Sequence, residues 1–306
     1  MHAKWIWRCS LITLVTAGPH LTHVHWVIAN SAHIGSRTML DANHPIRRIL
    51  KPFLYNTGAI NMQSTFALAP EYALLHRMTG LTYEGFKFGL SHLFDSYTYE
   101  TLPDLIESKK LGQDMEDQIP LCADGLPIWN AFQKFFQGYV DFFYKTNEDV
   151  NADKVLEEFW DVVEWRGKFG CKSRYGLPEL NKEGLVEYLT HFAFSATVWH
   201  ELAGTIVQYL ISPKGGCMKL RAGSNEADIQ AYVQDLILIG MTGMPEPLLM
   251  DDWSHLLPDE EEIMRLYNEL KVELDEISRK VDKANETRPH ACQSFNPKYL
   301  ECSVSV

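Results

Sequence analysis

The chain has few cysteines, and their spacing matches neither a disulfide framework nor a cysteine zinc site. The 306 residues contain six cysteines, and no two of them form a Cys-x-x-Cys pair. A disulfide framework and a cysteine-bound zinc site both require a denser pattern, so neither is expected. Reduced thiols are typical of the cytoplasm, which is the compartment we predict.

Excess basic charge and long apolar runs are missing as well. The chain carries 40 acidic against 28 basic residues, a formal net charge of −12, which argues against nucleic acid as a partner. No run of ~18 apolar residues is present, which argues against several membrane spans. Lys4 and Arg8 precede a short apolar run to Ala17. This run leaves a secretion signal as the alternative to the cytoplasm, although Ser10 and Thr13 interrupt it.

Apolar periodicity is what the sequence has in abundance, and it is helical. The hydrophobic share of 46% is enough for a sizeable core. Apolar residues recur at spacings of three and four in 128–144, and residues 182–211 are expected to form one long, buried central helix. No repeat or composition break divides the chain. We therefore predict a mainly α fold, with a single large helical domain spanning 1–306.

Histidines are the candidate functional residues. His20, His23, His25 and His33 cluster near the N-terminus, and His200 lies within the predicted central helix. Neutral imidazole is a common ligand of transition metals. On an ideal α-helix His20 and His25 lie about 140° apart, so they converge only if the helix widens into a π-bulge. His20 and His23 need no distortion, so spacing alone leaves both pairs open.

His200-Glu201 begins like the zinc-protease pattern His-Glu-x-x-His. Gly204 stands where that pattern has its second histidine, so the protease interpretation is rejected.

Several ordered segments together resemble one known family, the lipoxygenases. They are residues 3–10, 43–52, 119–120, 124–129, 176–178, 183–185, 194–200 and 302–306. The resemblance extends over nearly the whole chain. It implies the C-terminal part of a helical lipoxygenase catalytic domain, and we expect the family's N-terminal β-barrel domain to be missing.

The resemblance also implies a metal site and a reaction. It assigns His20, His25 and His200 as iron ligands, with the carboxylate of Val306 as a fourth, and it selects His25 over His23. Manganese is the alternative metal. No catalytic residue beyond the metal site is implied. The expected reaction is the dioxygenation of polyunsaturated fatty acids by O2 to hydroperoxides, the first step towards oxylipins.

Two positions depart from the family pattern. Gly204 stands where the family usually has an asparagine, four residues after the third histidine. Ser64 stands at a substrate-binding position that is usually alanine or glycine, and that controls where oxygen adds. The alternative function is therefore a catalytically impaired, lipoxygenase-like module that binds a lipid or a partner. Peripheral membrane contact and the oligomeric state are left open.

Overall fold

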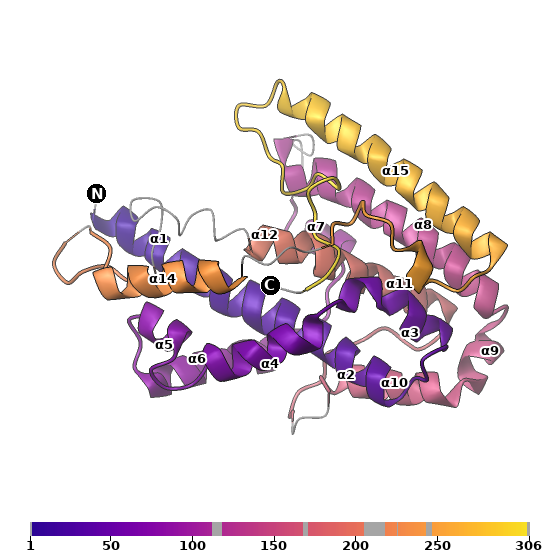
Figure 1. The fold of residues 1–306 in the computed structure, drawn as a ribbon, viewed down its shortest axis with the longest axis horizontal. Helices are drawn as coiled ribbons and strands as arrows, with labels where there is room; N and C mark the ends of the chain where they lie inside the picture. The colour runs from indigo at the N-terminus through magenta and orange to yellow at the C-terminus, as the bar shows by residue number, and fades with distance from the viewer. Residues whose placement is uncertain are drawn as a thin grey trace.

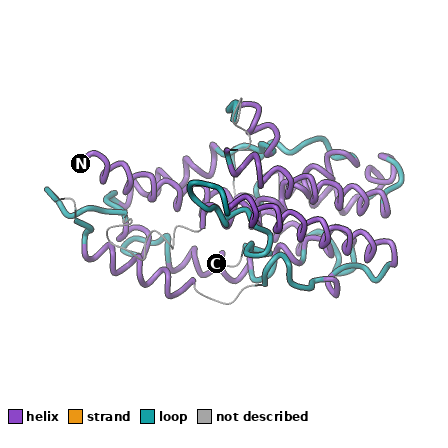
Figure 2. The backbone as a smooth tube through the Cα atoms, turned by 90° about the horizontal axis from the view of Figure 1, so that it is seen from above, coloured by secondary structure: helices purple, strands orange, loops and turns teal. Residues whose placement is uncertain are grey.

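The described chain is built from helices. The computed structural model describes residues 2–111, 118–167, 171–204, 218–224, 226–242 and 247–304. Within these ranges it contains two isolated β-bridges and no strand, so the predicted mainly α fold class is confirmed (Figure 2). Within the same ranges, no helix has both the length and the apolar character needed to span a membrane.

The helices are α1 (His2–Val15), η1 (Thr16–Ala29), α2 (Asn30–Thr38), α3 (Pro45–Leu50), η2 (Pro52–Leu54), α4 (Thr57–Ala67), α5 (Leu74–Met78), α6 (Tyr83–Ser96), α7 (Leu102–Ser108), η4 (Leu121–Gly125), α8 (Leu126–Phe143), α9 (Asn147–Ala152), α10 (Lys154–Glu164), α11 (Lys182–Phe194), η5 (Ser195–Trp199), α12 (His200–Gly204), α14 (Ile229–Thr242), η6 (Ser254–Leu256) and α15 (Glu261–Asn285).

Two long helices cross the interior, and each contains a π-helical segment. The first runs without a break through α1, η1 and α2, with η1 being π-helical (Figure 1). The second runs through α11, η5 and α12, with η5 being π-helical. A π segment uses i→i+5 hydrogen bonds, as when the Asn30 N–H donates to the His25 carbonyl. Such segments are frequent at functional sites.

The aromatic face predicted in 128–144 is buried, as expected. Helix α8 packs against α11 and α15, and Phe132, Phe136 and Tyr139 are at most 1% exposed. On α15 a face of apolar residues that recur every three or four positions is buried, while most of its charged residues face solvent. These helices form the main core, beside which the two π-containing helices meet.

Single residues divide two stretches of the chain into separate helices, and the predicted central helix is described only in part. Residues 46–61 fall in three helices, α3, η2 and the start of α4, because Pro52 interrupts α3 and Asn56, with a φ of 55°, precedes α4. Residues 151–163 are divided at Asp153, whose side chain caps α10. The predicted helix 182–211 is helical up to Gly204, and residues 205–211 lie outside the described ranges.

Asp235 is a buried acid on α14, which packs against α5. Among the described residues neither of its carboxylate oxygens has a hydrogen-bond partner, and burial raises its pKa from 3.8 to about 7. The folded chain therefore holds a proton that the unfolded chain has released between about pH 4 and pH 7. Stability from the protonated acid is present at low pH and is lost as the pH rises through this window.

Asp235→Asn is expected to remove this loss. The free energy of unfolding of the variant should match that of the wild type near pH 4 and exceed it by a few kcal/mol at pH 8, because one pKa unit is worth about 1.4 kcal/mol. Urea unfolding at several pH values measures this difference. Asp259→Asn, at an exposed acid, is the control. A difference that stays constant between pH 4 and pH 8 would contradict the buried-acid assignment.

Candidate metal centre

Three histidines from the two π-containing helices meet inside the fold. The Nε2 atom of His20 lies 3.2 Å from Nε2 of His25 and 3.3 Å from Nε2 of His200. The Nε2 atoms of His25 and His200 are 3.3 Å apart. The three nitrogens therefore form a nearly equilateral triangle, which we call the Nε2 triangle. Within the described ranges, it is the group of side chains that meets the geometry of a metal site.

The π-helical segment explains why residues five apart converge. His20 and His25 both lie on η1, where the wider turn brings residues i and i+5 to one face. His23 points elsewhere, because its ring stacks on Tyr97 with the ring centroids 4.1 Å apart. Burial, and secondarily Arg166, lowers the pKa of His23 to about 4. Of the two histidine pairs that spacing left open, the structure thus brings together His20 and His25.

The surroundings of the triangle are almost dry. His25 is 2% exposed and His200 1%, while His20 is partly buried. Burial lowers the pKa of His20 well below its usual range, and the nearby His25 and His200 lower it further. A neutral imidazole keeps a lone pair on one nitrogen, which is the form that binds a metal.

Asn61 on α4 determines which nitrogen of His25 carries the proton. Its Nδ2 donates to the His25 carbonyl at 3.1 Å, which turns its Oδ1 towards Nδ1 of the same residue at 2.9 Å. An amide oxygen can only accept, so Nδ1 of His25 is the donor and Nε2 is left as a bare acceptor facing the triangle. Asn61 is 4% exposed and lies 36 residues from His25. No spacing in the sequence could have revealed it.

His200 has an acidic neighbour on the opposite side of its ring. Its Nδ1 is 3.5 Å from Oε2 of Glu301, whose side chain is 24% exposed. The Glu301 carboxylate therefore lies on the edge of the imidazole that faces away from the triangle. Sequence analysis did not single out this residue either.

Gly204 lies directly beside the triangle, one turn after His200. A Cβ built on Gly204 would be 3.3 Å from Nε2 of His20 and 3.7 Å from its Cδ2. A side chain at this position would therefore point at the donor nitrogens. Glycine leaves this place without a side chain.

The donor set fits a transition metal. Nitrogens that share one cation at ~2.0–2.1 Å lie roughly 2.9–3.4 Å apart for right-angled to tetrahedral geometry, and the observed spacings fall in this range. In the tautomers that bind a metal, the three nitrogens direct lone pairs towards one another, and a cation between them stabilises this arrangement. Imidazole ligands suit iron, zinc, copper and nickel.

Two further predicted site residues are not part of the triangle. Val306 lies outside the described residues. The chain leading to it is buried as far as Val304, whose carbonyl accepts a hydrogen bond from the Thr57 hydroxyl at 3.1 Å. Ser64 is 4% exposed on α4, and its hydroxyl donates to the Asn61 carbonyl at 3.0 Å. The roles assigned to Val306 and Ser64 stay predictions.

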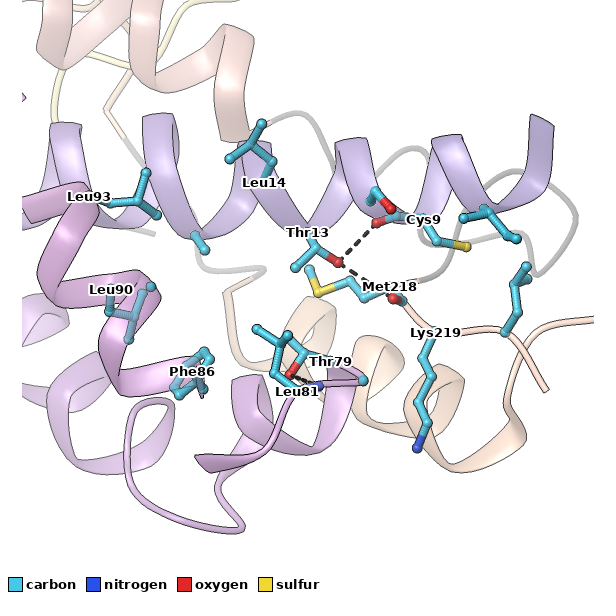
Figure 3. A pocket seen from close by; sticks show the side chains of 16 residues that line it. Cys9, Thr13, Leu14, Thr79, Leu81, Phe86, Leu90, Leu93, Met218 and Lys219 are labelled. Atoms are coloured by element: carbon cyan, nitrogen blue, oxygen red, sulfur yellow. Dashed lines mark hydrogen bonds between the residues drawn. The ribbon is translucent and has the colours of Figure 1, made fainter. Parts of the chain in front are cut away.

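An apolar cavity of about 500 Å³ opens beside the first long helix. Ala17, one turn before His20, lines it, and most of the other lining side chains are apolar. In Figure 3, Phe86 and Leu90 of α6 lie opposite Thr13 of α1 and Met218. The Thr13 hydroxyl donates to the Cys9 carbonyl at 2.9 Å, so this polar group on the cavity wall is already hydrogen-bonded. The cavity can accept an elongated hydrocarbon.

Comparison with known proteins gives one consistent family. A lipoxygenase family model matches residues 2–212. Lipoxygenase 6, chloroplastic, of Arabidopsis thaliana is 22% identical over 93% of this chain and 36% of its own length. Polyunsaturated fatty acid lipoxygenase ALOX15B of Rattus norvegicus is 26% identical over 64% of this chain and 30% of its own length. The chain thus spans about a third of these relatives.

The solved structures agree on the fold. The crystal structure of coral 8R-lipoxygenase superposes with a TM-score of 0.86 at 19% identity, covering 100% of this chain and 49% of that one. The described helices, including the two long ones that carry the histidines, thus have the arrangement of about half of that chain. The predicted fold type is confirmed.

Proposed function

The chain belongs to the lipoxygenase family, and on this premise we propose that it binds a non-haem iron and oxygenates polyunsaturated fatty acids to hydroperoxides. The Nε2 triangle of His20, His25 and His200 is the observation that carries the proposal. Manganese is the alternative metal, since a set of three imidazoles and one carboxylate does not exclude it. The name of the rat relative supports the substrate class.

When bound, the iron supplies the one-electron chemistry by which a doubly allylic C–H bond is oxidised and the carbon radical becomes open to O2. The chain itself orients the metal and the substrate and excludes water from the site. His20, His25 and His200 hold the metal, and Asn61 keeps the proton of His25 on the side away from it. The apolar cavity beside Ala17 holds the acyl chain and keeps water away from the reacting carbon.

Two finer assignments are part of the proposal. The carboxylate of Val306 is proposed as a fourth ligand, supported by the buried approach of the chain up to Val304. Ser64 is proposed to influence where oxygen adds, supported by its burial one turn after Asn61, the residue that contacts His25.

Metal analysis together with a diene assay tests the proposed function. The purified 306-residue chain is expected to retain about one iron per chain after dialysis. Linoleate and O2 should then produce a rise in the absorbance of conjugated dienes that an iron chelator suppresses. A chain that binds neither iron nor manganese, and that forms no diene after reconstitution, would exclude the proposal.

A second candidate is a lipoxygenase-like module that binds lipid without oxidising it. Gly204 favours it, because the family usually places a side chain there, pointing at the donor atoms. This candidate predicts saturable binding of linoleate in the apolar cavity and no diene, with or without iron. The same two measurements therefore separate the two candidates.

Replacing Asn61 with alanine is expected to weaken iron binding by about 10–100-fold, as is usual for residues that orient a metal ligand. The variant loses both hydrogen bonds to His25, so Nδ1 no longer has to carry the proton. Competition with a chelator of known affinity measures the effect. Gln63→Ala, at an exposed position on the same helix, is the control. Equal affinities for the two variants would rule out the orienting role.

A further inference from the structure

The segment 300–304 is held in place by hydrogen bonds on two sides. The Leu249 N–H donates to the Leu300 carbonyl at 2.8 Å, and the Cys302 N–H donates to the Pro247 carbonyl at 2.8 Å. Further on, the Thr57 hydroxyl donates to the Val304 carbonyl at 3.1 Å. Leu300, Cys302 and Val304 are at most 1% exposed. Glu301 is therefore carried on a fixed backbone between buried neighbours.

The Glu301 side chain uses this position to face His200. Its Oε2 lies 3.5 Å from Nδ1 of His200, on the edge of the ring that faces away from the triangle. The His200 ring is 1% exposed and the Glu301 side chain 24%, so water screens this pair only from one side. The carboxylate and the Nε2 triangle contact different nitrogens of the same imidazole.

We propose that Glu301 is a positioning residue for the metal centre, whose carboxylate keeps the proton of His200 on Nδ1 and leaves Nε2 as the donor to the metal. An ionised carboxylate only accepts hydrogen bonds, so it favours the tautomer that carries hydrogen on the facing nitrogen. The inference rests on the proposed function in so far as a metal binds at the triangle. The preference for one tautomer does not depend on the metal.

Glu301 thus has the same role at His200 as Asn61 has at His25, with one difference. Asn61 presents a neutral amide oxygen to His25, whereas Glu301 presents a negative charge to His200. A carboxylate behind a histidine increases the basicity of the donor nitrogen and fixes the ring. Glu301 also brings a negative charge close to the metal without occupying a coordination position.

Two measurements on the full 306-residue chain test the proposal. In the metal-free protein labelled with 15N-histidine, the His200 signals are identified by their absence in His200→Gln. They should report hydrogen on Nδ1 in the wild type and a mixture of tautomers in Glu301→Ala. Titration with Co²⁺, followed by its visible absorption bands, should then show a 10–100-fold weaker affinity in Glu301→Ala. Glu301→Gln should lose less, because its amide oxygen still accepts.

Glu286→Gln, at an exposed acid at the end of α15, is the matched control and should bind Co²⁺ like the wild type. The Glu301→Gln variant, which keeps the side-chain volume, decides the outcome if Glu301→Ala fails to fold. Hydrogen on Nε2 of His200 in the wild type, or unchanged Co²⁺ affinity in both Glu301 variants, would overturn the proposal. The expected tautomers in a chain that binds no metal would instead overturn the proposed function and leave the role of Glu301 on His200 intact.

Discussion

Replacing His25 with alanine is expected to lower the affinity for Fe²⁺ by more than about 100-fold, which exceeds the usual effect of losing a residue behind a ligand. The same replacement at His23, two residues earlier on η1, should leave the affinity within about threefold of the wild type. The physical reason is that the two side chains point in different directions. His25 contributes one corner of the Nε2 triangle, whereas His23 stacks on Tyr97. Diene formation from linoleate should be lost with the iron in the first variant only.

The pair is informative because the two substitutions are chemically identical and lie on one helix. Iron content after dialysis and chelator competition measure binding. Far-ultraviolet circular dichroism checks that both variants fold. His92→Ala, at an exposed histidine on α6, controls for nonspecific binding by surface histidines. Loss of iron in His23→Ala with retention in His25→Ala would show that the ligands are the i,i+3 pair instead.

Replacing Gly204 with alanine is the second large expected effect, a reduction of about tenfold or more in the rate of diene formation, equivalent to at least about 1.4 kcal/mol of barrier. The added methyl carbon would lie 3.3 Å from Nε2 of His20, beside the donor atoms. There it occupies space that O2, water or the substrate needs near the metal. Alanine favours a helix over glycine by up to about 1 kcal/mol, so the protein should not be destabilised.

This test is specific because the substitution should lower the activity without lowering the stability. Thermal unfolding of Gly204→Ala should occur at the same temperature as in the wild type or higher, while activity falls. Gly204→Asn, which restores the side chain usual in the family, should bind iron more tightly than Gly204→Ala. Leu202→Ala, at a partly exposed position on the same short helix, is the control. An unchanged rate in Gly204→Ala would show that the space beside His20 is not used.

Local sequence patterns predicted the helices well where one face is apolar. The aromatic face of α8 follows directly from spacings of three and four. The pattern failed where a single residue ends a helix. Pro52 and the left-handed Asn56 separate α3 from α4, and Asp153 separates α9 from α10.

The site was predictable only in its residue types. The clustered histidines and the buried position of His200 identified the candidates, and family resemblance chose among them. Spacing could not decide between His23 and His25, because their directions depend on whether the helix is α or π. Asn61 and Glu301 escaped notice, since a lone amide and a lone acid become significant only beside an imidazole that folding brings to them.

The amino-acid sequence by itself determined the helical architecture, the apolar interior and the supply of imidazole side chains, because these depend on short-range spacing and on composition. Tertiary structure alone decided which nitrogens meet, which tautomer His25 adopts and that the space beside His20 is the one Gly204 leaves without a side chain. Those features join residues as far apart along the chain as His20 and His200, which are separated by 180 positions, and His20 and Gly204. Contacts at that separation are set by how two long helices cross, and no local pattern encodes a crossing.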